Sequence, residues 1–158
     1  GRIRSPNITS RHWKGSQNIS NSASISHSKN LCGAVASHKK HNSSLGIDIE
    51  TNGRVHEDMW RLLFTQREIE WLLRLDKNQI ALISTIFFSL KEAFYKLQYP
   101  LTGVYLDFPE VEIEVVEDQY YATLLKHVNE AFTVGKQIPG KVLQLNNEII
   151  TYCSLPSL

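Results

Sequence analysis

The chain has 158 residues, of which 42% are hydrophobic and 21% charged, the length and composition of one soluble globular domain. This composition excludes wholly disordered, collagen-like, disulfide-rich and coiled-coil proteins. The longest apolar stretch, residues 80–88, is too short for a membrane span, and the first 20 residues contain no apolar segment typical of a signal peptide. We therefore expect a cytoplasmic protein.

Charge is distributed unevenly along the chain. Residues 1–44 carry seven Lys or Arg and no acid, whereas all 16 Asp and Glu lie in residues 45–158. This asymmetry suggests an anionic ligand near the first part. A nucleic acid is the weaker alternative, because the basic residues are diluted among serines and Trp13 is the single aromatic of the N-terminal arm. Cys32 and Cys153 lack metal-site spacing, so we expect reduced thiols, with a long-range disulfide as the alternative.

The first predicted elements are strands. Residues 1–22 form an irregular basic arm, and two short strands, Ala23–Ser26 and Leu31–Ser37, follow it. Lys39–Ser44 is expected to be a polar loop. Leu45–Glu50 alternates apolar and acidic residues and is typical of a half-buried strand.

Helical patterns occupy the middle of the chain. Apolar spacing over Val55–Leu75 predicts two helices broken near Thr65, which can start the second as an N-cap because Glu68 follows as in a capping box. Asn78–Tyr99 is a second long helical pattern, and Pro100 is expected to end it.

The remainder is rich in strand patterns, with a turn expected at Asn146–Asn147. No regular alternation of strands and helices is present, so the fold class is α+β, an antiparallel sheet packed against long helices. The predicted strands are Val104–Phe108, Glu110–Glu117, Tyr120–Leu125, Ala131–Val134, Val142–Leu145 and Ile149–Ser154.

Asp48 and Glu50 are the first candidate site residues. Two positions apart on a strand, their carboxylates leave the same face. They are either the polar side of an ordinary amphipathic strand or a pair of hard oxygen ligands for Mg²⁺.

The helical segment FSLKEAFYK holds a second charged group. Glu92 and Lys96 are four residues apart and share a helix face, and Lys91 adjoins them. The simpler interpretation is that Glu92 and Lys96 form a surface ion pair. The alternative is that Glu92, flanked by Lys91 and Lys96, contacts a metal-bound phosphate.

His27 lies in the segment ISHS, where the basic arm meets the first strands. A lone histidine is usually structural or simply exposed. Here Ser26 and its neighbours add hydroxyl donors, which favours a phosphate contact.

Together ISHS, GIDIE and FSLKEAFYK, in this order and spacing, resemble the 4′-phosphopantetheinyl transferases of the surfactin and enterobactin type. Residues 24–96 carry the resemblance strongly, and Phe88 stands where many members have Trp. The resemblance implies a Mg²⁺ ion, or Mn²⁺ in its place, bound by Asp48, Glu50 and Glu92. It also implies coenzyme A as co-substrate.

The resemblance assigns further roles. Coenzyme A would be contacted by Ser26 and His27 at its 3′-phosphate and by Lys91 and Lys96 at its phosphates. Two basic residues of the arm, Arg2 and Arg4, would also touch coenzyme A. Glu92, Lys96 and, more loosely, Glu68 would be the catalytic residues.

The implied reaction transfers phosphopantetheine from coenzyme A to a serine of an acyl or peptidyl carrier protein and releases adenosine 3′,5′-bisphosphate. Siderophore or nonribosomal peptide synthesis is the expected setting, without nucleic acid or membrane. A domain that binds carrier protein or coenzyme A without turnover is the alternative.

Surfactin-type members consist of two similar halves related by a pseudo-twofold axis. The chain starts at Gly1, and its only methionine is Met59. We therefore expect residues 23–158 to be one half of such a protein, preceded by the end of a missing half or by a linker. Three interpretations are open: a fragment, an inactive domain, or a domain that self-associates.

Overall fold

The computed structural model describes residues 21–158. In chain order the elements are β1 (Asn21–His27), β2 (Cys32–His38), β3 (Asn42–Thr51), η1 (Glu57–Met59), α1 (Trp60–Leu63), α2 (Gln66–Leu72), α3 (Lys77–Thr102), η2 (Phe108–Glu110), β4 (Val111–Val116), β5 (Gln119–Leu124), β6 (Gln137–Leu145) and β7 (Glu148–Pro156).

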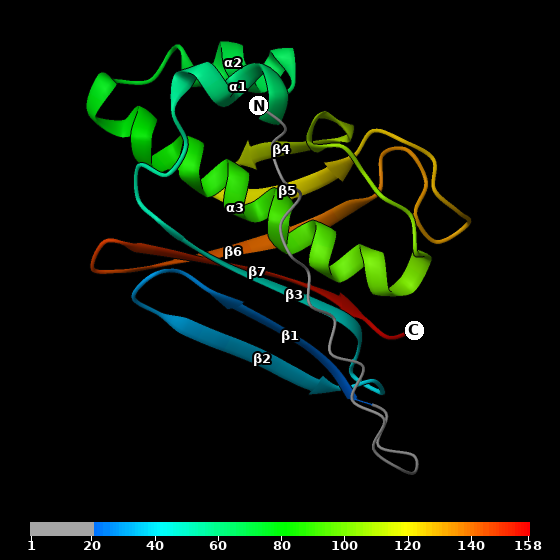
Figure 1. The fold of residues 1–158 in the computed structure, drawn as a ribbon. Coiled ribbons are helices and arrows are strands. Elements are labelled where there is room, and N and C mark those ends of the chain that lie inside the picture. The colour runs from blue at the N-terminus through cyan, green and yellow to red at the C-terminus, as the bar shows by residue number, and fades with distance from the viewer. Residues whose placement is uncertain (1–20) are drawn as a thin grey trace.

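Five strands form an antiparallel sheet in the order β3-β7-β6-β5-β4, and β1 and β2 form a separate antiparallel hairpin. Figure 1 shows α3 lying across the sheet and the hairpin beside β3, at the edge remote from β4. The predicted α+β class, with an antiparallel sheet packed against a long helix, is confirmed.

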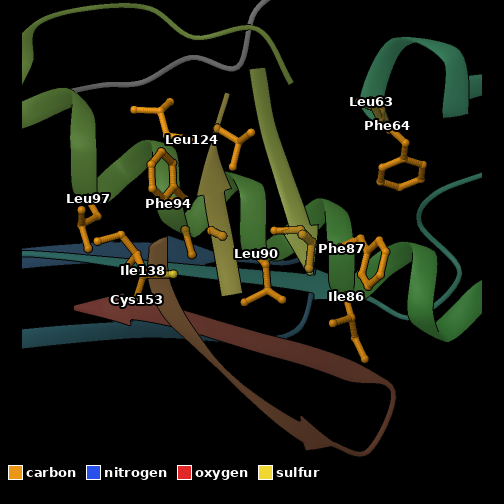
Figure 2. Close-up of a cluster of buried hydrophobic side chains, with 14 of the residues drawn as sticks. Leu63, Phe64, Ile86, Phe87, Leu90, Phe94, Leu97, Leu124, Ile138 and Cys153 are labelled. Carbon is orange, nitrogen blue, oxygen red and sulfur yellow. The ribbon is translucent and has the colours of Figure 1, made fainter. Parts of the chain in front are cut away.

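The core lies between α3 and the sheet. Apolar residues three or four positions apart make one stripe on α3, which points toward Leu124, Ile138 and Cys153 of the strands (Figure 2). Burying each large side chain of this kind contributes about 1.5–3 kcal/mol. The residues of the stripe are Phe87, Leu90, Phe94 and Leu97.

β3 contacts α3 most closely at Gly46. A methyl group added at Gly46 would overlap the backbone carbonyl of Ala93 in α3. Gly140 of β6 is also crowded, but its nearest neighbour is the end of the Leu90 side chain, which can move. Gly46 therefore allows the helix backbone to lie directly against the strand that carries Asp48.

Two local predictions are confirmed. The helical region breaks at Phe64–Thr65, where the Thr65 hydroxyl accepts from the Glu68 amide at 3.2 Å and Glu68 accepts from the Thr65 amide at 2.7 Å. Asn146 takes a left-handed φ of 54° in the turn between β6 and β7. A side-chain capping box thus marks the first boundary, and a left-handed backbone conformation marks the second.

The prediction that Pro100 ends the long helix is wrong. Pro100 lies inside α3, which continues to Thr102 and is capped by Gly103 with a φ of 66°. Pro100 removes one helical hydrogen-bond donor, and burial of Leu97 and Gln98 holds the last turn in place despite this loss.

Two predicted strands are absent from the described residues. Val104–Phe108 is an irregular connection, fixed where Gln98 donates to the Val104 carbonyl at 3.0 Å. Ala131–Val134 follows a tight turn, in which the Asn129 side chain accepts from the Phe132 amide at 2.9 Å. The predicted Lys39–Ser44 loop is shorter than expected, because β3 begins at Asn42.

Cys32 is exposed and Cys153 buried, and both are free thiols, as expected. Within residues 21–158, no helix combines the length and apolar character that crossing a membrane requires.

We predict that Gly46→Ala lowers the free energy of unfolding by about 1–3 kcal/mol or more, because overpacking here displaces backbone. Urea unfolding of Gly46→Ala and Gly140→Ala provides the measurement. The loss should be smaller for Gly140→Ala, whose methyl group faces a movable side chain. Equal losses, or a neutral Gly46→Ala, would show that the contact between β3 and α3 is not tight.

Candidate active site

The carboxylate of Asp48 lies between three polar side chains. It points from β3 toward α3, and the residue is 3% exposed. One oxygen, Oδ1, accepts from Lys96 Nζ at 2.8 Å and from Ser26 Oγ at 3.2 Å, and Oδ2 accepts from Ser89 Oγ at 2.9 Å. Asp48 thereby joins β1, β3 and α3 at one point.

A further hydroxyl extends this network into the sheet. Ser89 Oγ lies 2.8 Å from Thr151 Oγ1, and both residues are fully buried. Thr151 belongs to β7 and pairs with Asp48 in the register of the two strands. The sequence analysis missed both positioning residues. Ser89 lies one helical turn before Glu92 and could have been found by that spacing, whereas Thr151 carries no motif.

Glu50 and Glu92 share the neighbourhood of Asp48. Burial, with the Asp48 charge, raises the pKa of Glu92 to about 7, against the opposing effect of Lys96. Burial, Asp48 and Glu92 also raise the pKa of Glu50 to about 7, whereas Arg54, 3.9 Å away, lowers it. The three predicted carboxylates and Lys96 are therefore near enough to influence one another electrostatically, and Asp48 and Lys96 are in direct contact.

The donor set suits a Mg²⁺ ion chemically, because hard carboxylate oxygens are the ligands that Mg²⁺ prefers. Burial and the negative charge of Asp48 raise the pKa of both Glu50 and Glu92, so a cation nearby would stabilise their charged forms. As the side chains stand, no three His, Cys, Asp or Glu residues in the described part of the chain are gathered closely enough to hold one metal ion. Asp48 is paired with Lys96 instead.

Lys91 lies apart from this cluster, although it precedes Glu92 in sequence. Successive helix residues point about 100° apart, and Lys91 faces inward. Its ammonium group donates to Glu68 Oε2 at 2.7 Å, to the Leu63 carbonyl at 2.9 Å and to the Phe108 carbonyl at 3.0 Å. Its side chain is 1% exposed, so the predicted contact of Lys91 with coenzyme A phosphates is wrong for this structure.

Glu68 is equally enclosed, with a side chain that is 1% exposed. Besides Lys91, its carboxylate accepts from the amides of Thr65 at 2.7 Å and Ile113 at 2.6 Å. The predicted catalytic role of Glu68 is corrected accordingly: the carboxylate cannot reach a substrate without unfolding the start of α2. The buried pair instead ties α2 and α3 to β4.

The residues predicted to contact coenzyme A differ in accessibility. Ser26 is buried, and its hydroxyl also accepts from Lys96 Nζ at 3.0 Å and the Ile49 amide at 3.2 Å, so it holds the cluster rather than facing solvent. His27 is exposed at the end of β1. Arg2 and Arg4 lie outside the described residues.

Residues 44–153, well over half of the chain, match the family model described as the 4′-phosphopantetheinyl transferase superfamily. The chain is 32% identical over 121 residues to 4′-phosphopantetheinyl transferase Svp of Streptomyces mobaraensis, covering 76% of this chain and 45% of that protein. It is 34% identical over 90 residues to 4′-phosphopantetheinyl transferase Npt of Nocardia iowensis, covering 57% and 40%. The chain thus spans less than half the length of these curated relatives.

Solved structures support the fold alone, because their sequence identities are low. The holo-[acyl-carrier-protein] synthase of Thermotoga maritima has a TM-score of 0.56 at 21% identity, covering 72% of this chain and 63% of that chain. The holo-ACP-synthase of Plasmodium yoelii has a TM-score of 0.52 at 14% identity, covering 75% and 97%. The predicted fold family is confirmed.

The raised pKa of Glu92 predicts a pH dependence of stability. Between pH 4.5, its ordinary pKa, and about 7, the folded state holds a proton that the unfolded state releases, so stability should fall as pH rises. Glu92→Gln should weaken this fall and raise the free energy of unfolding at pH 8 by about 1–3 kcal/mol. Urea unfolding of the wild type and of Glu92→Gln at pH 5 and pH 8, with EDTA present, gives the free energies of unfolding to be compared. An unchanged pH dependence would contradict the burial argument, and the exposed Glu130→Gln is the control.

The buried pair predicts strong coupling between Glu68 and Lys91. Lys91→Met or Glu68→Gln alone should cost about 3–5 kcal/mol, because each leaves one buried group without its partner. The double variant removes both charges and keeps an acceptor for the Ile113 amide, so it should cost less than the sum. A double-mutant cycle by urea unfolding checks this; additive losses would show that the pair is not coupled.

Proposed function

The chain belongs to the 4′-phosphopantetheinyl transferase superfamily, and we propose that it transfers the 4′-phosphopantetheine arm of coenzyme A to a serine of an acyl or peptidyl carrier protein. One observation supports the proposal: Asp48 and Lys96 form an ion pair where β3 contacts α3, and Glu50 and Glu92 lie near enough for the charge of Asp48 to raise the pKa of each, inside the segment that the family model matches. The two curated relatives are transferases by name.

In the proposed reaction the carrier serine hydroxyl attacks the β-phosphorus of coenzyme A. A new P–O bond forms to the serine, and the bond from that phosphorus to the bridging oxygen breaks. The leaving group is adenosine 3′,5′-bisphosphate. Phosphoryl transfer of this kind depends mainly on positioning and on balancing charge, so a small set of side chains is sufficient.

Glu92 is the proposed base. It would accept the proton of the carrier serine directly, or orient a metal-bound water that does so. Lys96 would donate to the leaving phosphate, because its ammonium group already lies within the cluster, 2.8 Å from Asp48. His27, exposed at the end of β1, would contact the 3′-phosphate.

Asp48, Glu50 and Glu92 would hold the metal ion. Two carboxylates about 4 Å apart repel by about 4 kcal/mol at an effective dielectric constant near 20, which favours a cation among them. When bound, Mg²⁺, or Mn²⁺ in its place, balances this charge and polarises the phosphoryl group. Asp48 would have to exchange its Lys96 partner for the ion.

The alternative, a domain that binds coenzyme A or carrier protein without turnover, also has one observation in its favour. The carboxylates of the described residues are not gathered at a metal-binding spacing, and Lys96 occupies an Asp48 oxygen. We place either activity in the cytoplasm, since both cysteines are free thiols and reducing compartments maintain that state.

We predict that an apo carrier protein incubated with the chain, coenzyme A and Mg²⁺ gains the mass of one phosphopantetheine arm. Asp48→Asn and Glu92→Gln should slow this gain about a hundredfold or more, because each removes charge from the reacting centre. Mass spectrometry over time gives the rates, with Glu130→Gln as a matched control on an exposed surface. Coenzyme A binding without mass gain would favour the alternative, and rapid transfer by Glu92→Gln would refute the site.

A further inference from the structure

One face of β1 is built from serines. Ser22, Ser24 and Ser26 alternate along the strand and point toward β3, and two of them are buried. The intervening positions face solvent; Ile25, for example, is 67% exposed. Because successive strand side chains leave opposite faces, this pattern gives β1 a single contact face of hydroxyl groups.

These hydroxyls take the place of strand pairing. β3 is an edge strand of the five-stranded sheet, and in the described part of the chain no main-chain hydrogen bond joins it to β1. Instead Ser24 Oγ accepts from the Ile47 amide at 3.1 Å, and Ser26 Oγ accepts from the Ile49 amide at 3.2 Å. Each of these backbone amides lies on an edge strand and would otherwise lack a hydrogen-bond acceptor in the protein; here it donates to a serine hydroxyl.

The contacts advance in step along both strands. Ser24 and Ser26, two residues apart, bond to β3 amides that are also two residues apart. β1 therefore runs in the same direction as β3, and this alignment brings His27 level with Glu50, the next residues on each strand. The His27 side chain leaves the face of β1 opposite to Ser26, so this alignment sets its position along β3.

The far end of β1 is tied separately. In the turn after β1, Asn30 donates to Glu148 Oε1 at 3.2 Å, and the same oxygen accepts from the Thr51 hydroxyl at 3.3 Å. This contact lies at the end of β3, beyond Glu50. The hydrogen bond from Asn30 to β7 and those that the serines accept from β3 thus hold the hairpin on the sheet edge, together with Gly33, which packs against Ile49.

We propose that Ser24 is a positioning residue for coenzyme A binding. By accepting from the Ile47 amide it helps to set the register of β1 on β3, so that Ser26 meets Asp48 and His27, the next residue, is held level with Glu50. A strand docked through side chains lacks the main-chain ladder that normally fixes register, so the alignment depends on a few side-chain contacts, of which the bond from the Ile47 amide to Ser24 is one. Ser24 has no hydrogen bond to the site residues. The inference rests on the proposed function.

The test compares three variants in the full chain. Ser24→Ala removes the acceptor, Ser24→Thr restores a hydroxyl, and Ala23→Ser places one on the exposed face as a control. Ser24→Ala should raise KM for coenzyme A about threefold to tenfold with kcat nearly unchanged, as expected for one hydrogen bond. It should also speed hydrogen exchange of the Ile47 amide. Ser24→Thr should recover both, and Ala23→Ser should change neither.

Faster Ile47 exchange with an unchanged KM would overturn the inference, because the register would then not affect the ligand. Unchanged exchange would overturn it too. If the wild-type chain transfers nothing, the proposed function fails. Calorimetry then tests the inference by itself: the Kd for coenzyme A should be about threefold to tenfold higher for Ser24→Ala than for the wild type. Wild-type protein that binds no coenzyme A would contradict both.

Discussion

Burial of the Asp48 carboxylate determines how three parts of this protein fit together. A carboxylate removed from water is costly unless charged or hydrogen-bonding partners surround it. Lys96, Ser89 and Ser26 are those partners, and they come from two turns of α3 and from β1. To supply them, α3 must lie close to β3 at Gly46, and the hairpin must dock on the sheet edge. The fold and the site therefore stabilise each other.

The same helix carries two charge centres with different roles. Lys91 turns inward and, with Glu68, ties α2 and β4 to α3 without access to solvent. Glu92 and Lys96, four residues apart, share the face that meets Asp48. The inward pair keeps α3 in place, and the other face presents the proposed reacting groups. Lys91 and Glu92 are adjacent in sequence but have different surroundings, because successive residues of a helix point in different directions.

Local sequence patterns predicted much of this arrangement. Alternation over Leu45–Glu50 identified β3, and the Thr65 capping box identified the start of α2. The family resemblance assigned Asp48 and Lys96 to one site, but it did not predict their direct ion pair. Long-range packing determines the features that the sequence did not predict. It extends α3 beyond Pro100, and it directs the Lys91 side chain toward the protein interior. Neither propensity nor spacing contains that information, and Thr151 likewise joins the site only through strand pairing.

The central claim is that Asp48, Glu50 and Glu92 form the metal and phosphate centre of a phosphopantetheinyl transferase. Anomalous diffraction from crystals grown with Mn²⁺ and coenzyme A tests it most directly, because the signal locates the metal independently of any assumed role. We predict one Mn²⁺ bound by these three carboxylates and by the coenzyme A pyrophosphate, with Lys96 displaced from Asp48. A metal bound elsewhere, or coenzyme A bound away from this cluster, would contradict the account.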